Sequence, residues 1–197
     1  MLSELKPKLN PLINAIAKPF IKIPPNILTF LGIIPPILFL VCIISGQYVL
    51  ALLTFLGLFL DTLDGAVARM TGKTSAFGSF LDSSLDRVAD SIYILGFSFA
   101  GLVSWELASI LVVLSFLISY LRSRAEQAAK SSFSLNVGLI ERPERMILIF
   151  FALLSYLLAP AWRWQGLNFA GLTFSILILL SLLTICQRAW KAYQLLK

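Results

Sequence analysis

Histidine is absent from this 197-residue sequence, and charged side chains are scarce. The lack of histidine excludes a His-ligated metal centre, a Ser-His-Asp triad and an imidazole general base. Charged residues make up 13% of the chain and hydrophobic residues 58%, whereas soluble domains carry about 25% charged residues. The two cysteines, Cys42 and Cys186, lie in apolar segments and say nothing about redox compartment. These shortages exclude an ordinary soluble domain and direct attention to the long apolar runs.

Six apolar segments are long enough to cross a bilayer, which takes roughly 20 mainly apolar residues. They cover residues 27–45, 48–69, 77–101, 105–128, 143–160 and 168–188. Asn26 is placed to cap the first segment, and Pro35-Pro36 predicts a kink or local unwinding within it. We therefore predict an all-α integral membrane protein with six transmembrane helices.

An amphipathic segment precedes these spans. Residues 4–22 alternate apolar side chains with lysines and are interrupted by Pro7, Pro11 and Pro19, which is typical of a broken interfacial helix. We divide the chain into a juxtamembrane segment, residues 1–24, and a six-helix transmembrane domain, residues 25–197. The first residues lack the basic region and cleavage site of a signal peptide, so none is expected.

Basic residues are distributed very unevenly among the segments that join the spans. With six spans and a cytoplasmic N-terminus, every Lys and Arg except Arg163 falls on the cytoplasmic side, as the positive-inside rule expects. The net charge of +6 would also suit nucleic acid, but long apolar runs interrupt it. We interpret it as membrane topology plus an anionic ligand, with no nucleic acid partner. The sequence predicts a multi-pass plasma-membrane protein with both termini in the cytoplasm.

Four aspartates enter the second and third spans, where a charged side chain is costly and needs a partner. Asp61 and Asp64 are three residues apart, and Asp82 and Asp86 four, so each pair shares a helix face. The short connection makes the two helices antiparallel neighbours, so their acidic faces can meet at the cytoplasmic end. All-oxygen ligands favour a hard divalent ion, and we predict a site for Mg2+ or Mn2+, with two ions expected. The alternative is a structural ion-pair network with Arg69, Arg87 and Arg145.

Glycines and an arginine complete a spaced motif around these aspartates. It reads Asp61-x2-Asp64-Gly65-x2-Ala68-Arg69-x8-Gly78-x3-Asp82-x3-Asp86. Gly65 and Gly78 remove side chains where a bulky ligand can approach the helix backbone, and Arg69 can bind a phosphate. With eight positions at fixed spacing, the motif resembles the signature of the CDP-alcohol phosphotransferase family.

The resemblance implies transfer of the lipid-bearing phosphate of a CDP-linked lipid, CDP-diacylglycerol or CDP-archaeol, to a hydroxyl of a small alcohol, releasing CMP. It implies that Asp61, Asp64 and Asp82 hold the metal ions, and that Asp86 is the general base and also a metal ligand. The CDP-binding residues that it implies are Asn26, Asp61, Gly65, Ala68, Arg69 and Gly78. A homodimer is implied too, for which the small residues Gly96, Ala100 and Gly101 are a weak packing cue.

A cluster of cations lies at the end of the fourth span and the start of the fifth. It consists of Arg122, Arg124, Lys130, Arg142 and Arg145. Several arginines together suit a phosphate dianion, so we infer that the acceptor alcohol itself carries a phosphate. The alternative is that these residues only follow the positive-inside rule, and this interpretation is favoured for Lys130. Glu141 before Arg142-Pro143 predicts a helix start.

Within the family, this region resembles the enzymes that use inositol 1-phosphate, the phosphatidylinositol phosphate synthases of actinobacteria and the archaetidylinositol phosphate synthases of archaea. The residues that carry this likeness are Ser119, Tyr120, Arg122, Arg124, Ala125 and Glu126, followed by Gly138, Glu141, Arg142 and Arg145. We therefore favour inositol 1-phosphate as the acceptor. Glycerol 3-phosphate is the runner-up, giving a phosphatidylglycerophosphate-type synthase. A divalent-cation transporter is a remote alternative, because the aspartates cluster at one end of their helices instead of lining a path.

Overall fold

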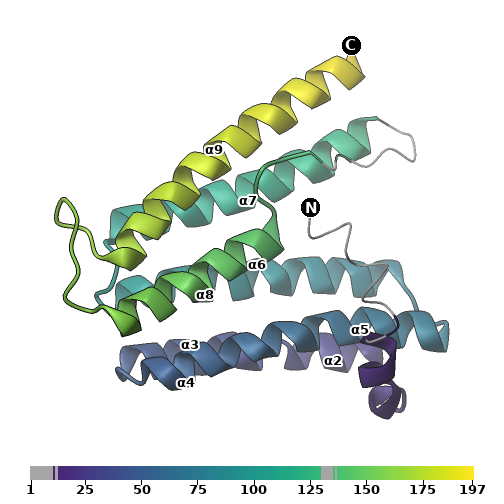
Figure 1. Cartoon of the computed structure of the whole chain (residues 1–197). Helices are drawn as coiled ribbons and strands as arrows, with labels where there is room; N and C mark the ends of the chain where they lie inside the picture. The colour runs from purple at the N-terminus through teal and green to yellow at the C-terminus, as the bar shows by residue number, and fades with distance from the viewer. Residues whose placement is uncertain (1–10, 12, 130–134, 136) are drawn as a thin grey trace. The chain divides into compact units, whose positions relative to one another are not determined.

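The computed structural model describes residue 11 and residues 13–129, 135 and 137–197. The regular structure of these residues is helical, which confirms the predicted all-α class (Figure 1). Contacts group the chain into two compact units, Met1–Gly96 and Phe97–Lys197. Each unit is described by itself.

The first predicted span is divided into two helices, α2 (Pro25–Leu31) and α3 (Ile34–Ile44), with a break at residues 32–33. The break has a chemical cause in Pro35-Pro36. Proline has no backbone N–H, so neither residue can donate to the carbonyl four positions earlier, in the preceding turn. The predicted local unwinding is therefore confirmed, and the two halves of the span are separate helices.

The second predicted span is interrupted as well, which the sequence did not reveal. Helix α4 (Tyr48–Thr54) leads through a 3-10 turn, η2 (Phe55–Gly57), into α5 (Leu58–Thr71). Gly57 lies against the Pro35 ring: a Cβ on this residue would come within 2.2 Å of the Pro35 Cγ. The interruption of one span thus packs against the interruption of the other, and only a glycine fits between them.

Aromatic packing holds this unit together beyond the two breaks. The rings of Phe39, Phe55 and Tyr93 are mutual neighbours, with centroids 4.7–5.4 Å apart. Tyr93 belongs to α6 (Ala76–Phe99), and on the same helix a Cβ at Gly96 would lie 2.7 Å from Phe39 Cε1. Gly96, one of the small residues named as a dimer cue, therefore makes a close contact within its own chain.

The described part of the N-terminal segment packs on α2 and α5 of the same unit. Residues 13–17 are helical and continue into a 3-10 turn, η1 (Lys18–Phe20). Ala17 is fully buried in a cluster with Leu28 of α2 and with Leu63, Ala66 and Val67 of α5. Lys18 and Lys22 are exposed, so the segment is amphipathic as predicted.

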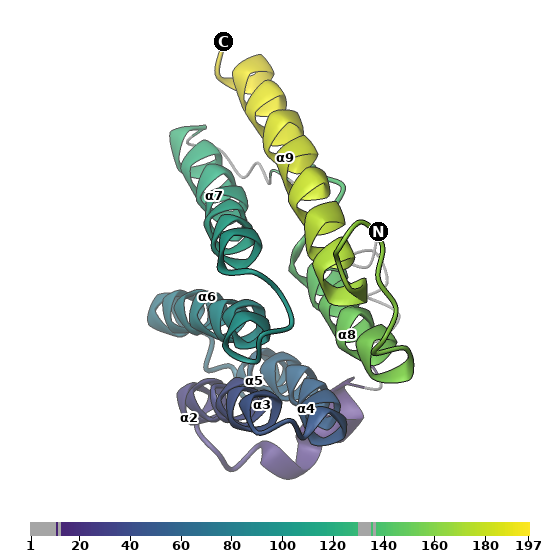
Figure 2. The same ribbon diagram turned by 90° about the vertical axis from the view of Figure 1, so that its left-hand side faces the viewer.

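The second unit holds three long helices whose starts are capped by the sequence. Ser104 caps α7 (Trp105–Ala128), and Asn168 caps α9 (Phe169–Leu196) by accepting from the Gly171 N–H at 2.8 Å. Helix α8 (Arg142–Leu158) begins with a capping box in which Glu141 and Glu144 bond to each other's backbone, which confirms the predicted start. Helix α9 packs against both α7 and α8 (Figure 2).

Each of the six predicted spans contains helix. By length and composition alone, only some of these helices qualify as candidates to cross a membrane. Four stretches of the described chain qualify: Pro25–Ile44, Tyr48–Thr71, Trp105–Ala128 and Phe169–Leu196. By contrast, α6 carries several aspartates and α8 has 17 residues. The last helix also continues eight residues past the predicted end at 188. The count of six spans stays a prediction.

Candidate active site

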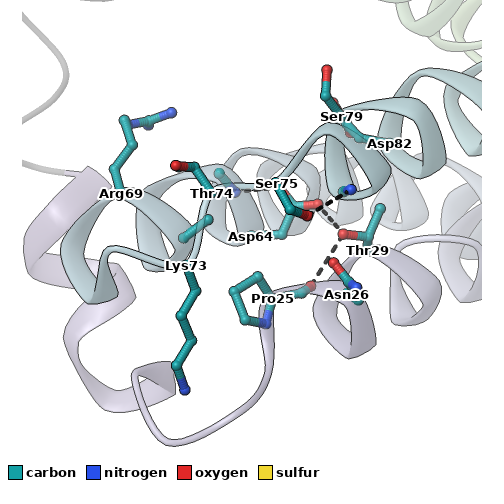
Figure 3. Close-up of a pocket in the computed structure, with 13 residues that line it drawn as sticks. Pro25, Asn26, Thr29, Asp64, Arg69, Lys73, Thr74, Ser75, Ser79 and Asp82 are labelled. Carbon is teal, nitrogen blue, oxygen red and sulfur yellow. Dashed lines mark hydrogen bonds between the residues drawn. The ribbon is translucent and has the colours of Figure 1, made fainter.

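A pocket of about 190 Å3 lies within the first unit, between α2, α5, the turn after α5 and the start of α6 (Figure 3). Thirteen residues line it: Pro25, Asn26, Thr29, Asp64, Gly65, Ala68, Arg69, Lys73, Thr74, Ser75, Gly78, Ser79 and Asp82. The list includes most of the predicted motif. Residues up to 57 positions apart in the chain, from Pro25 to Asp82, therefore meet at one cavity.

Helix α5 supplies the acidic and basic walls of the pocket. Asp64 is only 6% exposed, and both of its carboxylate oxygens accept hydrogen bonds, one from the Thr29 hydroxyl at 2.5 Å and one from the Gly65 N–H. One turn later, Arg69 folds back over Gly65: a Cβ at Gly65 would lie 3.2 Å from Arg69 Nη1. The guanidinium therefore covers the position that a side chain at residue 65 would occupy, and Arg69 and Asp64 line the same pocket.

The turn between α5 and α6 is shaped by glycine and serine. Gly72 has φ +67° and ends α5 in the left-handed conformation, with Lys73 N donating to Ala68 O at 2.9 Å. The Ser75 hydroxyl then accepts from Gly78 N at 3.0 Å at the start of α6. A Cβ at Gly78 would meet Ser75 Oγ at 3.1 Å and Asn26 Oδ1 at 3.3 Å, so this glycine lets α2 and α6 approach.

The four predicted metal ligands are placed differently. Asp64 and Asp82 line the pocket. Asp86 lies one turn further along α6, partly exposed, with its Oδ2 3.9 Å from Arg87 Nη1. Asp61 occupies α5 one turn before Asp64, but its side chain is outside the described part.

The fit of this donor set to a divalent cation rests on its chemistry. Among the side chains that the structure describes, no three acidic, histidine or cysteine residues are gathered closely enough to form a ready metal cluster. The two pocket aspartates offer hard oxygen donors, the type that Mg2+ and Mn2+ prefer. The site of four aspartates therefore stays a prediction, and the described donors are compatible with it.

The predicted acceptor arginines differ in their surroundings. Arg122 pairs with Glu126 at 3.0 Å, and Arg124 donates to Gln127 at 2.5 Å, both within α7. Arg142 is the first residue of α8, and Arg145, one turn on, is only 2% exposed. Burial at Arg145 speaks against a simple topology signal, which needs no buried side chain, whereas Arg122 and Arg124 are compatible with one. Lys130 lies outside the described residues.

The sequence interpretation missed Arg188, which organises the segment before α8. This side chain on α9 is 2% exposed and donates to Val137 O at 2.8 Å, Ile118 O at 2.7 Å and Glu141 Oε1 at 3.1 Å. Thr184, one turn earlier, accepts from the N–H groups of residues 139 and 140. Residues 137–141 are therefore tied to α9, and with them the start of the helix that carries Arg142 and Arg145.

Two polar residues of α2 also differ from expectation. Asn26 is not the helix cap: α2 begins at Pro25 after Pro24, with no side-chain cap, because proline at the first position needs no N–H partner. Its side chain lines the pocket instead. Thr29 was not singled out at all, although a threonine one turn after Asn26 in an apolar span was a signal that could have found it.

A helical protein of apolar composition, with carboxylates, an arginine and open glycines around one cavity, has the features of a membrane-bound enzyme that handles a phosphate ester. Residues 22–186 match the model of the CDP-alcohol phosphatidyltransferase family, so the chain belongs to this family of phosphotransferases. This confirms the resemblance inferred from the motif.

Relatives named as archaetidylinositol phosphate synthases resemble the chain over almost its whole length. The archaetidylinositol phosphate synthase of Pyrococcus horikoshii is 36% identical, with 98% of this chain and 96% of that protein covered. The archaetidylinositol phosphate synthase of Methanothermobacter thermautotrophicus is 33% identical, with 100% and 96% covered. The crystal structure of Mycobacterium tuberculosis phosphatidylinositol phosphate synthase with CDP-DAG bound has a TM-score of 0.76 at 26% identity, covering 92% and 93%. The same enzyme in complex with manganese and citrate also has a TM-score of 0.76 at 26% identity, covering 92% and 88%.

Proposed function

We propose that this enzyme transfers the lipid-bearing phosphate of a CDP-linked lipid to a hydroxyl of inositol 1-phosphate and releases CMP. The observation that carries the proposal is the pocket that gathers Asp64, Gly65, Arg69 and Asp82 in a chain of this family. Relatives named for inositol phosphate products, at 33–36% identity over nearly the full chain, support the acceptor. A related enzyme with CDP-DAG bound supports the donor class.

The donor nucleotide is assigned to the pocket of the first unit. Gly65 and Gly78 line the pocket without side chains of their own, Ala68 adds little bulk, and Arg69 supplies positive charge for the diphosphate. Asn26 offers an amide for hydrogen bonding to the nucleotide, and Asp61 is assigned to the same site from the family resemblance. In this assignment the lipid part of the donor stays in the bilayer. Both CDP-diacylglycerol and CDP-archaeol are compatible with that arrangement.

Asp61, Asp64, Asp82 and Asp86 are assigned as the residues that would hold divalent metal, with two ions expected. When bound, such ions neutralise the diphosphate and stabilise the departing CMP. A relative solved in complex with manganese supports this assignment. Arg69 lines the same pocket as Asp64 and adds a positive charge to it.

Asp86 is assigned as the general base. The inositol hydroxyl oxygen attacks the phosphorus that carries the lipid, the bond from this phosphorus to the bridging oxygen of CMP breaks, and CMP leaves with the bonding electrons. The proton of the attacking hydroxyl passes to an Asp86 oxygen, which must lie within hydrogen-bond reach of it. Arg142 and Arg145 are assigned to the acceptor's phosphate, with Arg122, Arg124 and Lys130 as further candidates.

The proposal includes a topology. Helix in all six predicted segments, together with the exclusion of every basic residue but Arg163 from one side, supports six spans with both termini in the cytoplasm. The active site then faces the cytoplasm, where a soluble alcohol phosphate can reach it. A single cysteine at position 163, in a Cys42→Ala, Cys186→Ala background, should react in intact cells with a membrane-impermeant maleimide, and one at position 73 should not. A homodimer is proposed on the family resemblance alone.

The decisive assay is CMP release by the purified enzyme with a panel of acceptors at a fixed donor. We expect turnover with inositol 1-phosphate and little with inositol, glycerol 3-phosphate or serine, in the presence of Mg2+ or Mn2+. Running the panel with both CDP-archaeol and CDP-diacylglycerol separates the two donors. Turnover with glycerol 3-phosphate but none with inositol 1-phosphate would replace the proposed acceptor with the runner-up, while leaving the reaction type intact.

A further inference from the structure

Thr29 has an unusual position for a polar residue of an apolar helix. It is 6% exposed on α2, lines the pocket and donates its hydroxyl proton to Asp64 Oδ2 over an oxygen–oxygen distance of 2.5 Å (Figure 3). Asp64 lies 35 residues later on α5. The contact therefore links two helices at the one aspartate that, among the described side chains, is both buried and part of the pocket.

The hydroxyl has one proton and two acceptors within reach. Pro25 O, in the preceding turn, is 3.1 Å from Thr29 Oγ1, whereas the carboxylate oxygen is 0.6 Å closer. A charged acceptor makes a shorter and roughly twice as strong hydrogen bond as a neutral one. The proton is thus committed to Asp64, and the link is more than the usual bond of a helical threonine to its own backbone.

The two protein donors to Asp64 constrain its carboxylate from both ends. Thr29 bonds Oδ2 and the Gly65 N–H bonds Oδ1, so rotation about the Cβ–Cγ bond would break both contacts. A carboxylate has about four lone-pair sites, and these bonds occupy one on each oxygen. The carboxylate plane is thereby held in a fixed direction relative to the pocket that Asp64 lines.

We propose that Thr29 is a positioning residue that orients the Asp64 carboxylate for the divalent cation; this inference rests on the proposed function. Groups that bond to metal ligands fix ligand geometry, and their removal typically lowers metal affinity or activity by about 10- to 100-fold. The competing explanation is that Thr29 only ties α2 to α5. A tie of that kind changes stability and leaves the metal affinity of the folded protein unchanged.

The test is direct titration of purified full-length protein in detergent with Mn2+ alone, followed by electron paramagnetic resonance of the free ion. Thr29→Val removes the hydroxyl at nearly constant volume, and Thr29→Ser keeps it. Thr173→Val is the matched control, because the Thr173 hydroxyl also bonds to a carbonyl one turn earlier, at 2.8 Å, but is not among the pocket residues.

We expect Thr29→Val to weaken Mn2+ binding about tenfold or more, with Thr29→Ser within about threefold of wild type and Thr173→Val unchanged. The concentration of metal that gives half-maximal turnover should rise in the same order. If the valine variant does not fold, Thr29→Ala removes the same hydroxyl with less bulk. Equal Mn2+ affinity in wild type and the folded valine or alanine variant overturns the inference, as does a serine variant that is as weak as valine.

A double-mutant cycle shows whether Thr29 acts through Asp64. In an Asp64→Asn background, Thr29→Val should add little to the loss of Mn2+ affinity, because the carboxylate that the hydroxyl orients is gone. Full additivity overturns the proposed coupling. The Mn2+ titration involves neither donor nor acceptor, so wrong assignment of inositol 1-phosphate leaves its outcome unaffected. Conversely, suppose that the wild-type enzyme turns over inositol 1-phosphate and Thr29→Val binds Mn2+ as tightly as wild type. That result overturns the role of Thr29 and leaves the proposed function intact.

Discussion

The two units of the chain use buried polar groups in different ways. In the first, Asp64 and Thr29 are buried at the wall of a cavity that Arg69 also lines. In the second, Arg188 is equally buried, but all three of its guanidinium nitrogens donate to the chain itself. The comparison teaches that burial of a charge does not by itself mark a ligand site. The buried polar groups of the first unit line a cavity that a ligand can enter. The Arg188 guanidinium instead bonds to Val137, Ile118 and Glu141 of the same chain.

The largest expected effect concerns Asp86 of the first unit. Asp86→Asn keeps the shape and removes the proton acceptor, so turnover should fall about 1000-fold, within the range for loss of a general base. Binding of the CDP-lipid should persist, which separates catalysis from the pocket. CMP release and equilibrium donor binding, measured on the same preparation, check this. Activity close to wild type would remove Asp86 as the base.

Loss of Arg188 should act on stability in the second unit. Arg188→Leu leaves Glu141 and two backbone carbonyls without their donor, and breaking a buried pair costs about 3 kcal/mol or more. Thermal unfolding in detergent should show a clear fall in midpoint. Gln187→Ala, at the exposed neighbouring position, is the control and should leave the midpoint unchanged. An Arg188→Leu protein as stable as wild type would contradict the role of this arginine as a loop anchor.

Substitution of one glycine in each unit tests the comparison and should have an effect of intermediate size. Gly57→Ala forces a methyl group to 2.2 Å from the Pro35 ring, and Gly138→Ala places one 2.6 Å from the Thr184 methyl at φ +147°. Overpacking of this kind costs about 1–3 kcal/mol. Because Gly57 directly precedes α5, a helix that lines the pocket, its variant should raise the donor KM. Gly138 lies before α8, so its variant should raise the acceptor KM; the same parameter changing in both would refute this division.

The smallest expected effect sharpens the assignment of the acceptor site. Arg142→Ala should raise the acceptor KM about tenfold, as expected for one charge-assisted hydrogen bond, and leave the donor KM nearly unchanged. Arg145→Ala should act in the same direction and also lower stability, because its side chain is buried. Arg163→Ala, which removes an exposed arginine from the loop after α8, is the control. Unchanged acceptor KM in both test variants would undo the phosphate pocket.

Much of the fold was predictable from the sequence because local signals decide it. Helix α7 begins and ends where the apolar run predicted, and Ser104 caps its start. Glu141 and Pro143 correctly predicted the start of α8. The break at Pro35-Pro36 follows from proline chemistry alone. The 3-10 turn at Phe55–Gly57 gave no such sign, because its cause is packing against a proline 22 residues earlier.

The site was predictable to the extent that it follows one spaced motif. Asp64, Gly65, Arg69 and Asp82 meet at the pocket as helical spacing and a short turn require. Thr29 escaped notice because its importance lies in a partner 35 residues away. Arg188 was counted only as a cytoplasmic charge for a similar reason, since its bonds reach 47–70 residues back along the chain. Contacts at that separation have no periodicity to reveal them.

Every residue that lines the pocket lies between Pro25 and Asp82. Proteins are made and inserted from the N-terminus, so a growing chain that has completed α6 already carries the whole lining, before any of the acceptor arginines has been translated. The pocket assigned to the CDP-linked lipid, which resides in the bilayer, is therefore synthesised first. The site assigned to the water-soluble acceptor is synthesised later.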